Sequence, residues 1–166
     1  MLQTLQRSFV FIVLVLAQVL VLNHVQIAGY ATPSLFIYYI LILNSDTSRN
    51  SLLLQSFLIG LCVDIFSNTP GMNAAAATLI AFVRRPILHM HMSRDIAEDF
   101  EPSIRTLGFF QFLRYVLDEA LIFTITLQLL SSLSFAHGKD FLLRIVTDTL
   151  MTIFFIMCTD ILRRKK

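Results

Sequence analysis

Runs of apolar residues separated by short polar gaps extend along the whole chain. A helix that crosses the hydrocarbon core of a bilayer needs about 20 mainly apolar residues, and six runs approach this length: 8–27, 31–43, 51–66, 72–88, 105–133 and 141–162. The pattern predicts an all-α integral membrane protein. We expect a bundle of six transmembrane helices that forms a single polytopic domain over residues 1–166.

The second, third and fourth runs are shorter than a full crossing. A helix rises about 1.5 Å per residue, so about 16 residues reach only about 24 Å across a core of about 30 Å. We therefore expect these segments to use flanking residues, local thinning of the bilayer or shelter inside the bundle. Whether the run 31–43 crosses completely is open at this level.

Basic residues are concentrated in alternate gaps between the runs. Lys and Arg accumulate on the cytoplasmic side of a membrane, so six spans with both termini in the cytoplasm place ten of the thirteen there: Arg7, Arg49, Arg84, Arg85, Arg94, Arg105, Arg163, Arg164, Lys165 and Lys166. Lys139 then lies in an external loop, and Arg114 and Arg144 lie within spans. A five-span arrangement puts one charged terminus on the opposite side and is therefore disfavoured. The first run lacks a small-residue cleavage site after its apolar core, which favours a retained signal anchor over a cleaved signal peptide.

The composition excludes an ordinary soluble domain and a nucleic-acid-binding surface. Hydrophobic residues make up 56% of the chain and charged residues 14%, with a mean hydropathy of +0.73, whereas soluble domains contain about 25% charged residues. The net charge of +2 comes from loop arginines and the basic tail, not from a polar surface with interleaved aromatic residues.

Known catalytic and metal-binding motifs are missing from the sequence. The topology places Cys62 and Cys158 in different leaflets, too far apart for a disulfide, and His89 and His91 have no further ligand at metal-site spacing. There is no Gly-rich phosphate loop, nucleophile elbow or zinc-protease motif. We expect no cofactor, no metal site and no enzymatic activity.

Charged residues inside the last two spans are the most unusual feature of the sequence. An ionised side chain at mid-bilayer costs about 2.5–3.5 kcal/mol on insertion scales, so these residues should face the interior, a partner or each other. At about 100° per residue, two polar stripes arise, one on each span: Gln111, Arg114, Asp118, Gln128 and Ser132, and Arg144, Asp148, Thr152 and Thr159. Glu119 lies about 100° away from the first stripe. We expect an internal network that joins the two helices, with a structural role favoured over a proton relay or substrate cavity: Gln111, Arg114, Asp118, Glu119, Arg144 and Asp148.

A tight turn separates the third and fourth runs. Asp64 closes the third run, residues 67–71 supply turn chemistry through Asn68, Pro70 and Gly71, and Asn73 is placed to cap the next helix by accepting its first free N–H groups. That helix carries a face of small residues that lets another backbone approach closely: Gly71, Ala74, Ala77, Thr78 and Ala81. The sequence predicts a tight, buried hairpin.

In this hairpin the chain resembles a known family, the bacterial rod shape-determining protein MreD. The resemblance rests on Gly60-x-x-x-Asp64, the turn over residues 67–71 and the small-residue helix from Asn73 onward. Chain length, the six-span layout and the basic tail extend it to essentially all 166 residues. One departure is visible, since many relatives have an apolar residue between the proline and the glycine, which are adjacent here as Pro70 and Gly71.

The resemblance implies a non-catalytic scaffold of the bacterial cytoplasmic (inner) membrane that acts in cell-wall elongation and helps maintain a rod shape. The implied partners are an MreC-like bitopic protein, the glycosyltransferase and transpeptidase that build peptidoglycan, and the actin-like protein MreB. Two contact surfaces follow as hypotheses. The small-residue face around Ala77, with Asp64, would contact a partner's transmembrane helix, and the polar stretch 89–103, with Arg94 and Glu98 one turn apart, would be either a solvated connection or a cytoskeletal contact.

Two other functional classes compete with a scaffold. A small-molecule-binding membrane subunit of a transporter, similar to the substrate-capture components of energy-coupling-factor systems, also has six helices and a polar interior. The external loops of such a subunit would have to supply aromatic and hydrogen-bonding residues, but the external loops of this chain are short and contain few of them. A membrane enzyme that uses Asp118, Glu119 and Asp148 would lack a nucleophile or metal set.

Overall fold

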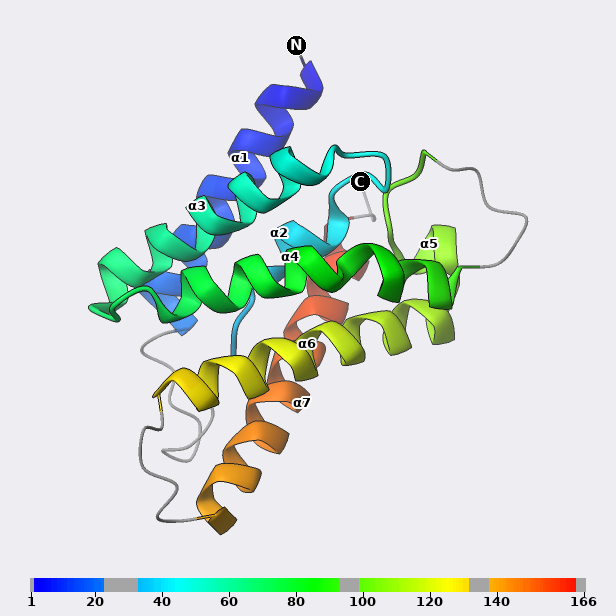
Figure 1. The fold of residues 1–166 in the computed structure, drawn as a ribbon. Coiled ribbons are helices and arrows are strands. Elements are labelled where there is room, and N and C mark those ends of the chain that lie inside the picture. Colours follow the sequence, from blue (N-terminus) through cyan, green and yellow to red (C-terminus); the bar gives the residue numbers. More distant parts are fainter. Residues whose placement is uncertain (1, 23–32, 93–98, 132–137, 164–166) are drawn as a thin grey trace.

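The computed structural model describes residues 2–22, 33–92, 99–131 and 138–163, and these ranges contain helices and no strand (Figure 1). The helices are α1 (Leu2–Ala17), which continues into one π-helical stretch η1 (Gln18–Leu22), α2 (Ile37–Ile42), α3 (Arg49–Ser67), α4 (Met72–His91), α5 (Ile104–Leu107), α6 (Phe109–Ser131) and α7 (Gly138–Arg163). Helix α3 packs on α4, α4 on α6, and α6 on α7, while α1 contacts α2 and α3. The prediction of an all-helical fold is confirmed for the described part of the chain.

The helices are in most cases longer than the apolar runs that predicted them. Helices α3 and α4 contain 19 and 20 residues, and α7 contains 26. Each extends beyond its run into polar residues, because helix propensity and packing do not stop where hydropathy falls. The first helix begins earlier than expected, and the end of its predicted run, 23–27, lies outside the described residues.

The second run differs most from a continuous span. Only Ile37–Ile42 is helical, and residues 33–36 precede it without a regular helix. Every residue from 33 to 43 is buried. Irregular backbone at membrane depth is tolerated only where other parts of the protein cover it. The burial of residues 33–43 agrees with the expectation that this short segment lies inside the bundle.

The fifth run is broken rather than continuous. Ser103 begins the short helix α5, with its Oγ accepting a hydrogen bond from the Thr106 N–H at 3.2 Å. Gly108 then adopts a φ of 86°, a left-handed conformation that L residues rarely take. Helix α6 starts directly after it, so the single span predicted over 105–133 is wrong in its first turn, and residues 132–133 lie outside the described ranges.

Contacts between loops and helices bring three arginines of the expected cytoplasmic side, Arg49, Arg85 and Arg163, to one end of the molecule. Arg49 lies over the ring of Phe82, with 4.4 Å from its Cζ to the ring centroid, and Arg85 Nη2 donates to the carbonyl of Thr47 at 2.7 Å. Arg163 pairs with Glu101 at 3.6 Å. The start of α3, the end of α4 and the end of α7 are therefore neighbours, as antiparallel packing of α3 with α4 requires.

Large apolar side chains lie on the outer surface, and polar side chains lie in the interior. Exposed apolar residues occur on α1, α3, α4, α6 and α7, and include Phe57, Phe82, Phe110, Leu150 and Phe154. Buried polar residues include Arg84, Glu119, Gln128, Asp148 and Asp160. A water-soluble protein rarely exposes apolar side chains over so many elements. The distribution fits a chain surrounded by hydrocarbon, in which polar groups turn inward.

Among the described residues, two helices have the length and composition for crossing a bilayer. They are Arg49–Ser67, with a mean hydropathy of 1.5, and Phe141–Arg163, with 1.9. The apolar helix over Phe9–Leu20 is shorter. Arg84 and Arg85 in α4, and Arg114, Asp118 and Glu119 in α6, lower the apolar character of those two helices. The part of the chain that the structure describes is thus all-helical, and two of its helices have membrane-spanning character.

Candidate functional site

Polar side chains from two helical elements, η1 and α7, hold the first part of the buried segment 33–43. Gln18 reaches it with both ends of its amide, since Nε2 donates to the Pro33 carbonyl at 2.9 Å and Oε1 accepts from the Leu35 N–H at 2.8 Å. The Ser34 N–H donates to Thr152 Oγ1 of α7 at 3.1 Å. A buried backbone group without a partner costs about 1–3 kcal/mol. These side-chain hydrogen bonds replace the backbone hydrogen bonds that residues 33–35 would make within a longer helix.

Arg84 binds the other end of the same segment. Its side chain is 0% exposed, and its guanidinium donates to the carbonyls of Leu41 and Leu43 and to the Tyr115 hydroxyl at 3.1 Å. Tyr115 also donates to the Leu41 carbonyl at 3.4 Å. A cation at a helix C-terminus satisfies carbonyls that have no partner within the helix. The expectation that Arg84 faces the cytoplasm is therefore wrong, because α2 ends beside it and supplies acceptors that no sequence pattern shows.

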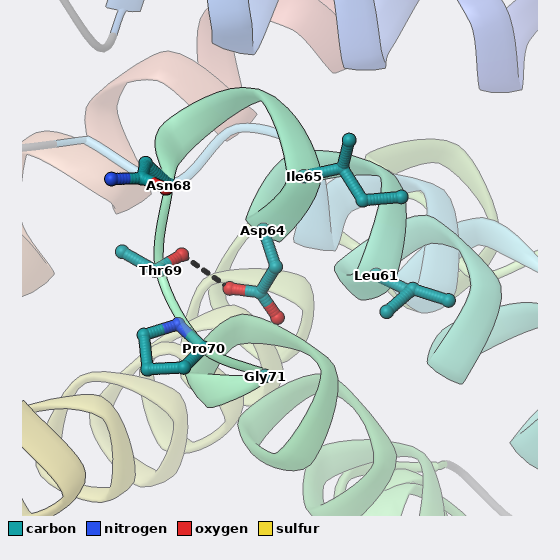
Figure 2. Close-up of a pocket in the computed structure, with 7 residues that line it drawn as sticks. All are labelled: Leu61, Asp64, Ile65, Asn68, Thr69, Pro70 and Gly71. Atoms are coloured by element: carbon teal, nitrogen blue, oxygen red, sulfur yellow. Dashed lines mark hydrogen bonds between the residues drawn. The ribbon is translucent and has the colours of Figure 1, made fainter.

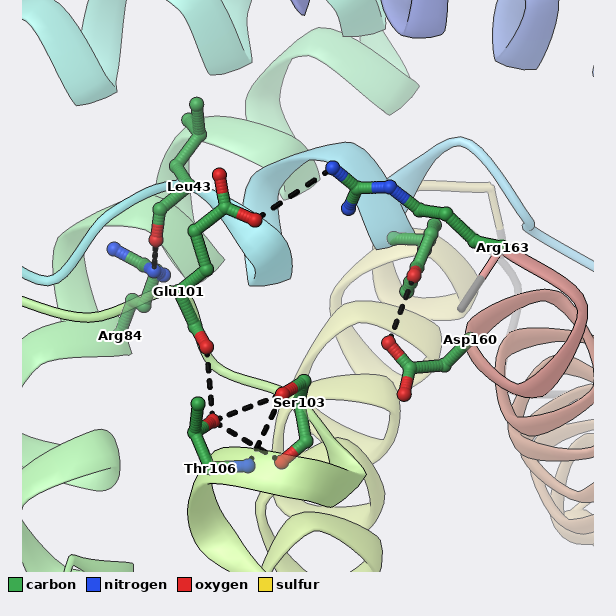
Figure 3. A network of polar contacts seen from close by, with 8 residues as sticks. Leu43, Arg84, Glu101, Ser103, Thr106, Asp160 and Arg163 are labelled. Carbon is green, nitrogen blue, oxygen red and sulfur yellow. Dashed lines mark hydrogen bonds and ion pairs between the residues drawn. The ribbon is translucent and has the colours of Figure 1, made fainter. Parts of the chain in front are cut away.

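A second polar network joins α2, α7 and the segment before α5 (Figure 3). The Tyr38 hydroxyl donates to Asp160 Oδ1 at 2.9 Å, and the Ile104 N–H donates to Asp160 Oδ2 at 3.3 Å. The Glu101 carboxylate forms an ion pair with Arg163 at 3.6 Å, and the Glu101 backbone carbonyl accepts a hydrogen bond from the Thr106 hydroxyl at 2.8 Å. The sequence interpretation missed Asp160, although an acid within the apolar run 141–162 was a usable signal. The structure shows that its side chain is fully buried.

At the opposite end of α3, Asp64 organises the turn into α4 (Figure 2). Its Oδ1 accepts from the Asn73 N–H at 3.0 Å, from Asn73 Nδ2 at 2.9 Å and from Thr69 Oγ1 at 2.5 Å. Its Oδ2 accepts from the Ala74 N–H at 2.8 Å. A buried carboxylate thus binds the first free N–H groups of α4, where the helix dipole also favours negative charge.

The backbone of the turn follows the predicted chemistry, but the cap does not. Asn68 has a φ of 53° and Gly71 a φ of 75°, both left-handed, so the predicted turn residues take the conformations for which Asn and Gly are suited. Asn73 does not accept the N–H groups of α4, because its own N–H and side-chain amide donate to Asp64. The prediction that Asn73 caps α4 is wrong, and Asp64 of the preceding helix does so instead.

Gly60 explains why Asp64 can reach α4. A Cβ at position 60 would lie 2.6 Å from Ala74 Cα and 2.7 Å from the Asn73 carbonyl oxygen. Only a residue without a side chain allows α3 and α4 to approach so closely. The pair Gly60 and Asp64, one helical turn apart, therefore forms one structural unit that fixes the hairpin.

The small-residue face of α4 is covered by this chain itself. Ala74, Ala77 and Ala81 are buried, in a helix that packs on both α3 and α6. The hypothesis that this face contacts a partner's transmembrane helix is therefore wrong, because the close approach that small residues allow is already used between α4 and its own neighbours. A hollow of about 530 Å³ opens instead at the outer side of the turn, lined by Leu61, Asp64, Ile65, Asn68, Thr69, Pro70 and Gly71 (Figure 2).

Replacing Ala77 by leucine should destabilise the fold rather than affect a partner. Inserting a larger side chain into a packed helix interface costs typically about 1–3 kcal/mol. Ala75 lies on the same helix but is exposed, so Ala75→Leu is the matched control and should be close to neutral. Thermal melting in detergent, followed by circular dichroism, compares the two variants. Equal melting temperatures would contradict the buried position of Ala77.

The predicted network between the last two spans exists in part. Gln128 Nε2 of α6 donates to Asp148 Oδ2 of α7 at 3.0 Å, and both residues are buried. Asp118 instead pairs with His91 of α4 at 2.7 Å. Arg114 and Arg144 are exposed, so their predicted place inside the network is wrong, and Gln111 is half-buried. The hydrogen bond between Gln128 and Asp148 therefore joins α6 to α7.

Glu119, which the stripe analysis set apart, is the most deeply buried acid of α6. Its side chain is 0% exposed. The position results from packing, since α4 and α7 cover different faces of α6, so the buried surface of α6 is wider than one polar stripe.

The described residues contain no group of three or more His, Cys, Asp or Glu side chains placed to hold a metal ion. Cys62 and Cys158 are free thiols, as expected. The predicted pair of Arg94 and Glu98 lies outside the described residues. Comparison of the chain with protein-family models, with curated proteins and with solved structures finds no match.

Proposed function

We propose that the chain is a non-catalytic membrane scaffold of the machinery that elongates the bacterial cell wall, in the manner of MreD. The observation that carries the proposal is the use of the buried polar residues. Gln18, Arg84, Asp64 and Asp160 each bind backbone groups of this chain, so their hydrogen bonds maintain the arrangement of helices. Such residues serve to hold a shape, as a scaffold requires.

The hairpin of α3 and α4 supports the family resemblance in physical terms. The resemblance rests on Gly60, Asp64 and the turn that follows, and these residues act together at the closest approach of the two helices. A sequence signature with one mechanical role in the fold is a stronger link than the same residue types scattered along a chain.

The proposed topology has six membrane crossings and both termini in the cytoplasm. Helices α3 and α7 have the composition of spans. The gathering of Arg49, Arg85 and Arg163 at one end of the molecule supports an orientation in which that end faces the cytoplasm. The turn with Asp64 then faces the periplasm.

We propose that the partner's single transmembrane helix packs beside this turn, where the hollow lies and where Ile65 and Phe66 expose large apolar side chains. The partner is an MreC-like bitopic protein, and through it the scaffold positions the glycosyltransferase and transpeptidase of peptidoglycan synthesis. The cytoplasmic end would contact the actin-like protein MreB.

Site-specific photocrosslinking tests this contact. A photoreactive residue at position 65 should capture the MreC-like protein in a rod-shaped bacterium, whereas one at position 150 on α7 should not. The two positions are matched, because Ile65 is 69% exposed and Leu150 is 62% exposed, both as apolar side chains. The same chain should restore rod shape to cells depleted of their own MreD.

Two results would contradict the proposal. Round cells despite normal membrane insertion of the chain would remove the role in cell shape. Crosslinks to the MreC-like protein from neither position, together with a rise in melting temperature on addition of a vitamin-like ligand, would favour a substrate-capture subunit of a transporter instead.

A further inference from the structure

Glu119 differs from the other buried acids in its hydrogen bonding. Asp64 accepts four hydrogen bonds, Asp148 accepts one from Gln128, and Asp160 binds Tyr38 and the Ile104 N–H. Both carboxylate oxygens of Glu119 are buried and have no hydrogen-bond partner among the described residues. Within the described residues, the Glu119 carboxyl group therefore makes no hydrogen bond that stabilises the fold.

Arg84 is a buried cation whose charge acts on Glu119, and its hydrogen bonds go to other groups. Arg84 and Asp118 exert the main electrostatic influence on Glu119. The guanidinium of Arg84 binds Leu41, Leu43 and Tyr115, and its Nη1 is buried without a partner. Within the described part of the chain, the ion pairs do not include one between Arg84 and Glu119.

Two states of the carboxyl group have very different costs in this position. An ionised carboxylate without hydrogen bonds in a protein interior costs several kcal/mol, whereas a neutral carboxylic acid avoids most of this cost. Loss of the proton would create a negative charge beside the buried guanidinium. That charge would compete with the carbonyls of Leu41 and Leu43 for Arg84.

We propose that Glu119 is a proton-binding site, and that its proton state decides whether Arg84 holds the end of α2. With the proton bound, the guanidinium stays on the carbonyls of Leu41 and Leu43 and the segment 33–43 is fixed. When the proton leaves, Arg84 turns toward the carboxylate and the segment loses that anchor. The proposal goes beyond the scaffold function, and its test does not depend on that function.

Of the other titratable and charged groups on the elements around α6, those whose side chains the structure describes have partners or are at least partly exposed. Tyr38 of α2 binds Asp160 of α7, His91 of α4 binds Asp118, and Asp148 binds Gln128. Tyr115 binds Arg84. The remaining basic and imidazole side chains on these elements are exposed or half-buried: Arg85, His89, Arg105, Arg114, Arg144 and Arg163. A proton lost from Glu119 therefore leaves Arg84 as the buried charge able to respond.

Infrared spectroscopy of the full chain in lipid nanodiscs tests the proton directly. A neutral carboxylic acid has a carbonyl stretching band that a carboxylate lacks. We expect this band at neutral pH in the wild type, its loss at alkaline pH, and its absence from Glu119→Gln. Asp118→Asn is the matched control, since this neighbouring acid is half-exposed and paired with His91, and it should keep the band. A spectrum that is the same with and without Glu119 would overturn the proposal.

Labelling glutamate with carbon-13 gives the same answer without a variant. The chain contains three glutamates, Glu98, Glu101 and Glu119, and eight aspartates. A carbonyl band that shifts on labelling belongs to a glutamate, and Glu101 forms an ion pair with Arg163. A band that does not shift would assign the proton to an aspartate and would overturn the proposal.

Hydrogen exchange tests the consequence for α2. Amides of segment 33–43 should exchange faster in the wild type than in Glu119→Gln at alkaline pH, and equally in both at neutral pH. The comparison at equal pH removes the intrinsic effect of pH on exchange. Equal exchange at both pH values would show that the proton state does not control the hold of Arg84.

Discussion

Replacing Arg84 by methionine is expected to lower the free energy of unfolding by about 3 kcal/mol. Methionine fills a similar volume but donates no hydrogen bond, so the buried carbonyls of Leu41 and Leu43 lose their donor. The adjacent Arg85 provides the matched control. It is half-buried and makes one bond, to the Thr47 carbonyl, so Arg85→Met should cost about 1 kcal/mol or less.

Unfolding of the two arginine variants is measured by titration with a denaturing detergent and followed by circular dichroism, because the chain has no tryptophan for fluorescence. Arg84→Lys should recover part of the loss, since an ammonium donates to carbonyls but cannot reach all three acceptors. Equal stability of Arg84→Met and Arg85→Met would contradict the role of Arg84 in holding segment 33–43.

Replacing Asp64 by alanine is expected to have a similarly large effect, about 3 kcal/mol. The change leaves the buried N–H groups of Asn73 and Ala74 without an acceptor and removes the charge that complements the start of α4. Asp64→Asn should be intermediate, because an amide keeps one acceptor oxygen but carries no charge. The measurement is thermal melting in detergent.

Asp46 is the control for Asp64. It is an exposed acid in the connection between α2 and α3, and Asp46→Ala should change stability by less than about 0.5 kcal/mol. A loss of stability in Asp46→Ala as large as that in Asp64→Ala would mean that net charge, and not the cap of α4, is responsible.

The turn between α3 and α4 illustrates how far local sequence signals reach. Asn68 and Gly71 were predictable as turn residues, because left-handed backbone conformations favour these residue types. The cap was not predictable in the same way. Asp64 lies nine residues before Asn73, and its carboxylate reaches α4 only because Gly60 lets the helices approach.

The buried residues of α4 and α6 also could not be predicted from local sequence signals. Helical periodicity places Arg114 and Asp118 on one stripe, but it cannot say which stripe faces the interior. Packing of α6 against both α4 and α7 buries Glu119 and leaves Arg114 exposed. Arg84 was counted among basic residues at a membrane surface, since the acceptors that bind it belong to α2, more than 40 residues earlier in the chain.

The sequence by itself determined the helical class, the apolar outer surface and the hairpin, because hydropathy and turn chemistry are local properties of a few consecutive residues. Only the tertiary structure decided the partner of each buried polar side chain. Such partners come from segments distant in sequence. A buried polar group without a partner is costly, and helix packing decides which neighbour lies within hydrogen-bonding distance of it. Gln18, Arg84, Asp64 and Asp160 have such partners, whereas Glu119 has no hydrogen-bond partner within the described residues.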